Sequence, residues 1–197
     1  VSRLEASGAI PIGKSNVPEW AGAHTFNPVF GHTRNPWNSA RSAGGSSGGS
    51  GVALATGMVW LATGNDLGGS LRVPASFNGV VGLRPSPGRV PRNARLPAFD
   101  TLWVEGPMGR NIADVALMLD GGSGHSPGDP LSFDSAGPSF SQALSGAALP
   151  RQVAFSPDLG VVPMEPEVAE ICAGAAEGFA AIGATVCRDT PDFSGAI

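Results

Sequence analysis

Two serines that each lie among glycines are the residues of this chain best suited to chemistry. Ser46 lies in GGSSGGS (44–50), and Ser70 lies further along the chain in GNDLGGSLR (64–72). Glycine has no Cβ, so the backbone N–H groups of such loops can approach a ligand closely. A serine hydroxyl among these donors is suited to nucleophilic attack, because the N–H groups can stabilise the oxyanion that forms. Two such loops, joined by an apolar run at 52–62, predict two halves of one site.

Two opposite charges flank the second serine. Asp66 precedes Ser70 by four positions and Arg72 follows it by two. They form either an ordinary ion pair within a loop or a buried pair that supports a nucleophile. A catalytic side chain needs such support, because its geometry must be held within narrow limits.

Two further motifs match in letters but not in context. GAIPIGKS (8–15) fits the phosphate-loop pattern, yet Pro18 lies where the helix after Lys14 should already be running. GGSSG fits the G-x-S-x-G pattern centred on Ser46 and on Ser47, but no strand precedes it, as a nucleophile elbow requires. A glycine-serine run can also be a flexible linker, although this one leads directly into an apolar segment.

The histidines and cysteines show no functional spacing. His24, His32 and His125 lie in loops without a nearby acidic partner, and we expect them to be surface or structural residues. Cys172 and Cys187 form neither a disulfide framework nor a metal motif. We expect buried thiols in a reducing, cytoplasmic compartment, and we predict no metal and no other cofactor.

Charge and length exclude several classes of protein. The 197 residues carry a net charge of −4 and a single lysine, Lys14, with no basic cluster. Direct binding to nucleic acid therefore has little electrostatic support. No window approaches the ~18 apolar residues of a membrane span. The chain opens at VSRLEASGA without an initiator methionine, so we expect a fragment of a longer protein, whose leader, if any, is unknown.

Predicted strands and helices alternate along the chain, which indicates an α/β fold. Residues 14–43 and 121–150 read as irregular connections. We predict strands at 9–13, 58–63, 80–83 and 153–155. We predict helices that end before Gly8, that span 48–56, that start after an N-cap at Asn111 and that start at Pro166. An apolar stripe on the last helix predicts core packing; it comprises Val168, Ile171, Ala175, Phe179 and Ile182.

The order and spacing of several segments resemble the amidase signature family. The matching segments are GKSNVPEW (13–20), TRNPWN (33–38), GGSSGGS, the run from 64 to 91, and GPMGRNIADVALMLDG (106–121). The core of the resemblance covers about 8–135, and it implies a single amidase signature domain over 1–197. The implied fold is a mixed sheet flanked by helices on both sides, of which this fragment holds a part.

The resemblance implies a serine hydrolase that uses no histidine. Ser70 is then the nucleophile that forms an acyl-enzyme, and Ser46, after a cis peptide bond, relays the proton. Supporting residues are Ser47, Asp66 and Arg72. The implied oxyanion hole consists of the backbone N–H groups of Leu67, Gly68, Gly69 and Ser70. The third catalytic residue is a buried lysine whose pKa must be lowered for it to act as a base.

The chain departs from this pattern at three points. Lys14 lies too close before Ser46 and matches the family's GKTN-type segment, which is not the position of the base. The catalytic lysine is therefore missing from the chain, and we expect the fragment alone to be inactive. Asn65 replaces the Thr or Ser common before the aspartate. The C-terminal part, which builds much of the family's substrate pocket, is also absent.

Two functions from different classes follow from the resemblance. The first is an amidase that hydrolyses a carbon–nitrogen amide bond of a small molecule, with no nucleic acid or membrane partner, and that could form a homodimer. The second is the amidotransferase subunit that frees ammonia from glutamine for charged tRNA, within a complex. DPLS (129–132), which resembles general amidases, and the sparse charge favour the first. A third possibility is a nonenzymatic binding protein with a degenerate site. The intact Ser46 and Ser70 argue against it.

Overall fold

The computed structural model describes residues 1–92 and 97–195. The contacts divide the chain into two compact units, Val1–Ser145 and Gly146–Ile197, which are described separately. Strands and helices alternate in both, so the predicted mixed α/β class is confirmed. No helix among the described residues is both long and apolar enough to cross a membrane.

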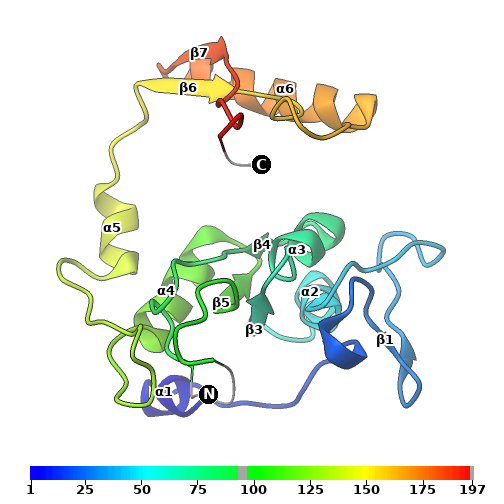
Figure 1. Cartoon of the computed structure of the whole chain (residues 1–197), viewed down its shortest axis with the longest axis vertical. Helices are drawn as coiled ribbons and strands as arrows, with labels where there is room; N and C mark the ends of the chain where they lie inside the picture. The colour runs from blue at the N-terminus through cyan, green and yellow to red at the C-terminus, as the bar shows by residue number, and fades with distance from the viewer. Residues whose placement is uncertain (93–96, 196–197) are drawn as a thin grey trace. The chain divides into compact units, whose positions relative to one another are not determined.

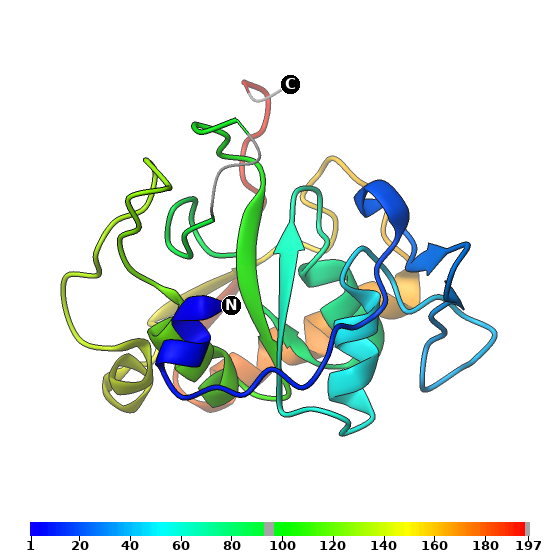
Figure 2. The ribbon, with the colours of Figure 1, turned by 90° about the horizontal axis from the view of Figure 1, so that it is seen from below.

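An antiparallel sheet forms the centre of the first unit (Figure 1). Its middle strand is β5 (Val104–Gly109), which pairs with β3 (Leu61–Asp66) on one side and with β4 (Val81–Gly82) on the other. β3 and β5 run side by side over their full length (Figure 2), with Leu61 opposite Gly109 and Asp66 opposite Val104. The predicted strand at 80–83 is thus confirmed.

Two helices, α2 (Gly48–Ala55) and α3 (Arg72–Asn78), pack on one face of this sheet. They enclose a core of fully or almost fully buried side chains: Leu54, Leu71, Ala75 and Met108. Close packing depends on Gly106 of β5, where an added Cβ would lie 2.6 Å from Leu71 Cδ1. Both helices follow the serine-glycine loops directly, so the core fixes where those loops end.

The helix α4 (Ile112–Gly122) packs on the other face. Asn111 caps it as predicted, because its Oδ1 accepts a hydrogen bond of 2.9 Å from the N–H of Asp114. Val115 and Leu119 are buried, whereas Ile112 is exposed. The first helix, α1 (Ser2–Ala6), packs on α4 and ends, as predicted, before Gly8. Figure 1 shows the sheet between α4 and the pair α2 and α3.

The strand predicted at 9–13 is wrong. This segment has neither helix nor strand, and Ile10 and Ile12 are exposed. An apolar run becomes a strand only where another strand can pair with it, and Pro11 lacks the N–H that pairing requires. The predicted irregular region that follows contains three short elements, η1 (Glu19–Ala21), β1 (Phe26–Asn27) and β2 (Gly31–His32).

The strand predicted at 58–63 begins later than expected. β3 starts at Leu61, and the side chains of Met58 and Trp60 are exposed rather than buried. The N–H groups of Met58 and Val59 both donate to the carbonyl of Ala53 instead, so these residues complete the C-terminal end of α2. The last carbonyl groups of a helix have no partner within the helix, so they need hydrogen bonds of this kind.

The second unit is a β-α-β arrangement. β6 (Gln152–Phe155) and β7 (Thr185–Arg188) pair in parallel, and α6 (Pro166–Ala181), which begins at Pro166 as predicted, connects them. The apolar stripe predicted as core is largely exposed, and Ala176 is the buried residue of α6. A sheet of two short strands is too small to cover a helix of this length. Cys172 and Cys187 are also exposed, contrary to our expectation of buried thiols.

The predicted connection at 121–150 contains one helix of its own, α5 (Phe140–Gly146). Asp120, near the end of α4, accepts hydrogen bonds from the N–H groups of Phe140 and Ser141, at 2.6 and 3.1 Å, and from the Ser141 hydroxyl. A single carboxylate therefore satisfies two of the free backbone donors at the start of α5.

Candidate active site

The two serine-glycine loops lie against each other. We call residues 44–48 the Ser46 loop and residues 67–71 the Ser70 loop. The N–H of Ser47 donates a hydrogen bond of 3.2 Å to the carbonyl of Ser70. The loops lead into α2 and α3, which pack on each other. The structure therefore brings together two segments that a helix and a strand separate in the sequence.

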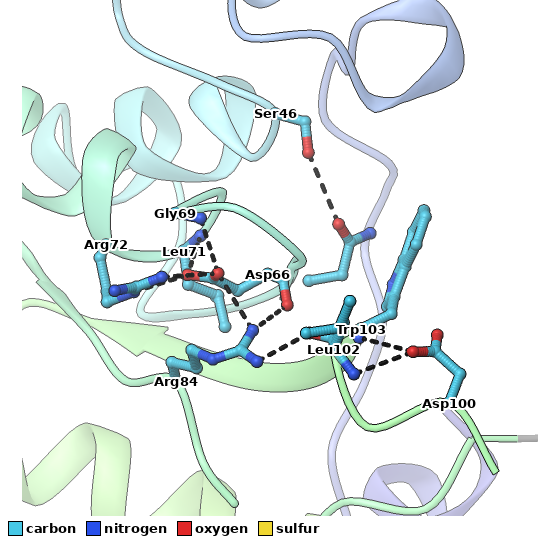
Figure 3. A network of polar contacts seen from close by, with 10 residues as sticks. Ser46, Asp66, Gly69, Leu71, Arg72, Arg84, Asp100, Leu102 and Trp103 are labelled. Atoms are coloured by element: carbon cyan, nitrogen blue, oxygen red, sulfur yellow. Dashed lines mark hydrogen bonds and ion pairs between the residues drawn. The ribbon is translucent and has the colours of Figure 1, made fainter. Parts of the chain in front are cut away.

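Ser46 is buried and follows a cis peptide bond, Gly45–Ser46. Its hydroxyl donates to Oδ1 of Asn65 at 3.5 Å (Figure 3). Ser70 is half-buried, and among the described residues no hydrogen bond joins its hydroxyl to that of Ser46. The proposed transfer of a proton between the two serines thus stays a prediction.

Thr25, which the sequence analysis did not single out, holds the Ser46 loop. Its side chain is almost fully buried, and its hydroxyl donates to the carbonyl of Gly44 at 2.8 Å and accepts from the N–H of Gly48 at 3.0 Å. Because Gly45 has no Cβ, the backbone at Ala23 can pack closely against the Ser46 loop. An added Cβ at Gly45 would lie 2.6 Å from the carbonyl oxygen of Ala23. Thr25 lies well upstream in an irregular region, where no local pattern marks it.

We expect Thr25→Val to destabilise the protein by about 1–3 kcal/mol, because the isosteric change leaves the buried Gly48 N–H without its acceptor. The Gly44 carbonyl also loses the hydroxyl and keeps only the backbone N–H of residue 25. Denaturant unfolding measures the effect. Thr56→Val is the matched control, since Thr56 is exposed and its hydroxyl donates only to a carbonyl of its own helix. Equal stability of the two variants would show that Thr25 does not hold the loop.

Asp66, at the end of β3, organises the Ser70 loop. Its carboxylate is fully buried and accepts from the N–H groups of Gly69 and Leu71 at 2.7 and 3.1 Å. Arg72 donates to both carboxylate oxygens at 3.0 Å, and Nη1 of Arg84 lies 3.2 Å from Oδ1 (Figure 3). We call Asp66, Arg72 and Arg84 the Asp66 cluster. Asp66 and Arg72 thus form an ion pair directly beside the loop, in which Asp66 is buried and Arg72 is exposed, while their role in catalysis stays a prediction.

The charge state of Asp66 follows from these contacts. Burial opposes ionisation and acts to raise the pKa of Asp66. The hydrogen bonds from Arg72, Gly69 and Leu71, together with the positive charge of Arg72, outweigh burial and hold the pKa well below its usual range. The same pair raises the pKa of Arg72. The carboxylate is therefore ionised at neutral pH.

Arg84 is a second residue that sequence reasoning missed. It also donates to the backbone carbonyl of Asp66, and its Nη2 donates to the carbonyl of Leu102 at 2.7 Å. Arg84 therefore joins the Ser70 loop to the segment that enters β5. All of α3 lies between Asp66 and Arg84 in the sequence, so their separation suggests no contact until the fold is known.

The four proposed oxyanion donors are not equivalent. The N–H of Gly69 already donates to Asp66, so this group is committed within the loop. The N–H groups of Leu67, Gly68 and Ser70 make no hydrogen bond to another described residue. At Gly68 an added Cβ would meet no atom within 4 Å, which leaves open space beside the loop. Three of the four predicted donors thus remain candidates for holding an oxyanion.

The other predicted residues divide between the site and the surface. Ser47 is buried, and its hydroxyl lies where a Cβ at Gly64 of β3 would fall, so it packs the Ser46 loop onto the sheet. Lys14 is exposed, and no helix starts directly after it, in agreement with our rejection of a phosphate loop.

The histidines lie outside the two loops. His24 shares a hydrogen bond of 3.2 Å with Ser42, and His32 stacks on Phe26 with ring centroids 4.2 Å apart. The ring of His125 lies 3.4 Å from both oxygens of Ser132. Among the described residues, none of the three rings forms a hydrogen bond with Ser46 or Ser70.

The chain is similar in sequence to known proteins over almost its whole length. The amidase family model matches residues 1–194. The chain is 41% identical over 195 residues to an acylamidase of Rhodococcus erythropolis, covering 98% of this chain and 41% of that protein. It is also 41% identical over 191 residues to the A-type subunit of the glutamyl-tRNA(Gln) amidotransferase from Moorella thermoacetica, covering 96% and 39%.

The same relationship appears in three dimensions. The crystal structure of a bacterial aryl acylamidase of the amidase signature family superposes with a TM-score of 0.89 and 33% identity, over 96% of this chain and 39% of that one. The chain thus spans about two fifths of the length of the relatives that it matches. A family match over almost all its residues, on the same fold, shows that the chain belongs to the amidase signature family.

Proposed function

We propose that this chain carries the nucleophile and proton-relay half of an amidase that hydrolyses a carbon–nitrogen amide bond of a small molecule. The observation that carries the proposal is the contact between the two loops, the 3.2 Å hydrogen bond from Ser47 to the carbonyl of Ser70. It supports the proposal because it joins the loop of a nucleophile candidate, Ser70, to the loop of a relay candidate, Ser46.

In the proposed reaction, the Ser70 oxygen attacks the carbonyl carbon of the amide. Ser46 takes the proton of Ser70 and gives its own to a basic lysine outside this chain. The negative oxygen of the tetrahedral intermediate accepts hydrogen bonds from the N–H groups of Leu67, Gly68 and Ser70, which stabilise charge that the substrate lacks. The carbon–nitrogen bond then breaks as the lysine returns a proton through Ser46 to the nitrogen, which leaves as the amine. Water hydrolyses the acyl-enzyme, which releases the carboxylic acid and restores the Ser70 hydroxyl.

A second candidate is an A-type amidotransferase subunit, which would release ammonia from glutamine within a complex that serves charged tRNA. The relative from Moorella thermoacetica supports it, because its identity to this chain equals that of the acylamidase. The net charge of −4 without a basic cluster favours the free amidase, since a partner of tRNA gains from positive surface.

One experiment separates the two candidates. The product of the complete gene is purified alone and tested with an anilide, an alkyl amide and glutamine, with release of amine or ammonia as the measurement. We expect turnover of at least one of the first two without any partner. A different result would identify the amidotransferase instead. In that case glutamine would be the one substrate that is hydrolysed, and ammonia would be released only from preparations in which partner subunits co-purify.

We expect Lys14→Ala to leave most of the amide turnover intact, within about threefold of the original enzyme. The reason is that Lys14 is exposed, whereas a lysine base must be desolvated to lose its proton. Its neighbours serve the fold, since Ser15 shares a hydrogen bond of 3.0 Å with Ser50 of α2. The measurement is kcat in the full-length enzyme. A loss beyond a hundredfold in a folded variant would make Lys14 the base.

A further inference from the structure

Arg84 contacts Asp66 in two ways, and one of them bears on a proposed oxyanion donor. Its Nη1 lies 3.2 Å from Oδ1 of the carboxylate and also donates to the backbone carbonyl of Asp66 (Figure 3). Arg72 binds the carboxylate, through Nε and Nη2. Of these two arginines, Arg84 is therefore the one that holds the main chain at the end of β3.

The carbonyl of Asp66 and the N–H of Leu67 belong to the same peptide unit, which is trans. A trans peptide unit is planar, so its C=O and N–H point in opposite directions and rotate together. A group that holds the Asp66 carbonyl on one side therefore sets the direction of the Leu67 N–H on the other side. This N–H makes no hydrogen bond to another described residue, so it can donate to a ligand in the direction that Arg84 sets.

Arg84 is itself held in place at its other nitrogen. Nη2 donates to the carbonyl of Leu102 at 2.7 Å, and the N–H of Leu102 donates to Oδ1 of Asp100 at 2.8 Å. Arg92 donates to the same carboxylate at 3.1 Å. Only 24% of the Arg84 side chain is exposed, and a guanidinium presents its donors in a fixed planar fork. The nitrogen that faces Asp66 is therefore fixed in position.

A second candidate donor, the N–H of Ser70, is directed in a comparable way. The carbonyl of Gly69, which shares a peptide unit with that N–H, accepts a hydrogen bond of 2.7 Å from the N–H of Val73 in the first turn of α3. At Asp66 the strand has just ended, and a side chain takes the place of the helical donor. The helix thus directs one candidate donor of the loop, and Arg84 directs another.

We propose that Arg84 is a positioning residue, which directs the Leu67 N–H toward the oxyanion by holding the Asp66 carbonyl on the opposite side of the peptide unit. Arg84 contacts no substrate in this role and transfers no proton. The inference rests on the proposed function, because the oxyanion forms when Ser70 attacks an amide. A donor that is held in place before the reaction stabilises the developing charge without having to reorient.

Two matched substrates of the full-length enzyme test the proposal, the amide that it hydrolyses fastest and the corresponding thioamide. Sulfur is a weaker hydrogen-bond acceptor than oxygen, so a well-directed N–H favours the amide. In Arg84→Met we expect kcat for the amide to fall about tenfold to hundredfold, less than when an oxyanion donor is deleted, and KM to stay within about threefold. The thioamide should lose less than about threefold in kcat, so the amide-to-thioamide ratio should fall by about threefold or more.

The ratio distinguishes positioning from a merely structural role, because partial unfolding lowers both rates by the same factor. Arg110→Met is the matched control, since Arg110 also donates to backbone carbonyls, those of Leu54 and Val59, but lies at the opposite end of β5. It should leave the ratio unchanged. Melting temperatures are measured in parallel. Equal factors for the two substrates in Arg84→Met, or no change in either rate, would overturn the proposal.

Should Arg84→Met not fold, Arg84→Gln takes its place, because its amide nitrogen ends two bonds short of Nη1 and does not reach the Asp66 carbonyl. The same fall in the ratio is expected, and the same outcomes overturn the proposal.

Ser70→Ala separates the failure of this inference from that of the proposed function. Amide turnover that survives Ser70→Ala contradicts the proposed nucleophile and, with it, the proposed function. Turnover that Ser70→Ala removes, together with an unchanged amide-to-thioamide ratio in the Arg84 variant, contradicts the role of Arg84 alone.

Discussion

Ser70→Ala in the full-length enzyme should lower amide turnover by about 10⁴-fold or more and abolish labelling by a fluorophosphonate probe. Loss of a serine nucleophile has effects of this size elsewhere, because the remaining donors and binding groups cannot replace the covalent step. The variant should stay folded, since Ser70 contributes its backbone carbonyl, rather than its hydroxyl, to the contact with Ser47. Active-site titration and peptide mapping of the labelled protein are the measurements.

Ser76→Ala is the matched control, because Ser76 is an exposed serine of α3, the helix that directly follows the Ser70 loop. It should label at the original rate. Label recovered on Ser47 or Ser50, or undiminished label in Ser70→Ala, would exclude Ser70 as the nucleophile. Both Ser47 and Ser50 are buried in the packing of α2 against β3, and the Ser50 hydroxyl donates to the carbonyl of Thr63 at 2.9 Å.

Asp66→Asn should have the largest effect on stability, a loss of about 3 kcal/mol at pH 7. The carboxylate is fully buried and joins two backbone N–H groups and two arginines, and breaking a buried ion pair typically costs about 3–5 kcal/mol. We expect the lower end of this range, because 56% of the Arg72 side chain stays in solvent. Denaturant unfolding measures the loss, and Asp134→Asn, at an exposed aspartate, should change little.

The same substitution predicts a pH dependence with a definite sign. The folded state lowers the pKa of Asp66, so its stabilisation is fully present above the unfolded-state pKa of about 3.9 and is lost as pH falls through the folded-state value. The difference between the original protein and Asp66→Asn should therefore be constant from pH 6 to 8. It should shrink below about pH 4. A difference that grows as the pH falls would contradict the ionised, buried carboxylate.

The sequence alone determined the features whose causes are local. The glycines of the Ser46 and Ser70 loops, the cap at Asn111 and the helix that starts at Pro166 each depend on residues within one turn or loop. Such features follow from backbone freedom, hydrogen-bond chemistry and fixed spacing, which a single sequence displays. The ordered motifs also led to the correct family.

Apolar runs, by contrast, did not reliably predict which segments form strands or which side chains are buried. The segment 9–13 is apolar yet has no strand, and the stripe of α6 is apolar yet largely exposed. A strand needs a pairing partner and an apolar face needs a surface to cover it, and both are properties of the surroundings rather than of the segment.

The tertiary structure decided which distant residues meet at the two serines. Thr25 reaches the Ser46 loop from an upstream segment, Arg84 reaches Asp66 from beyond α3, and Asn65 of β3 accepts a hydrogen bond from Ser46. Such contacts depend on how whole strands pair, because a shift of one position in the pairing of β3 would turn Asn65 to the opposite face. The sequence therefore determined which loops could perform the chemistry, and only the fold decided which side chains hold them in place, because those contacts come from chain pairing and not from spacing.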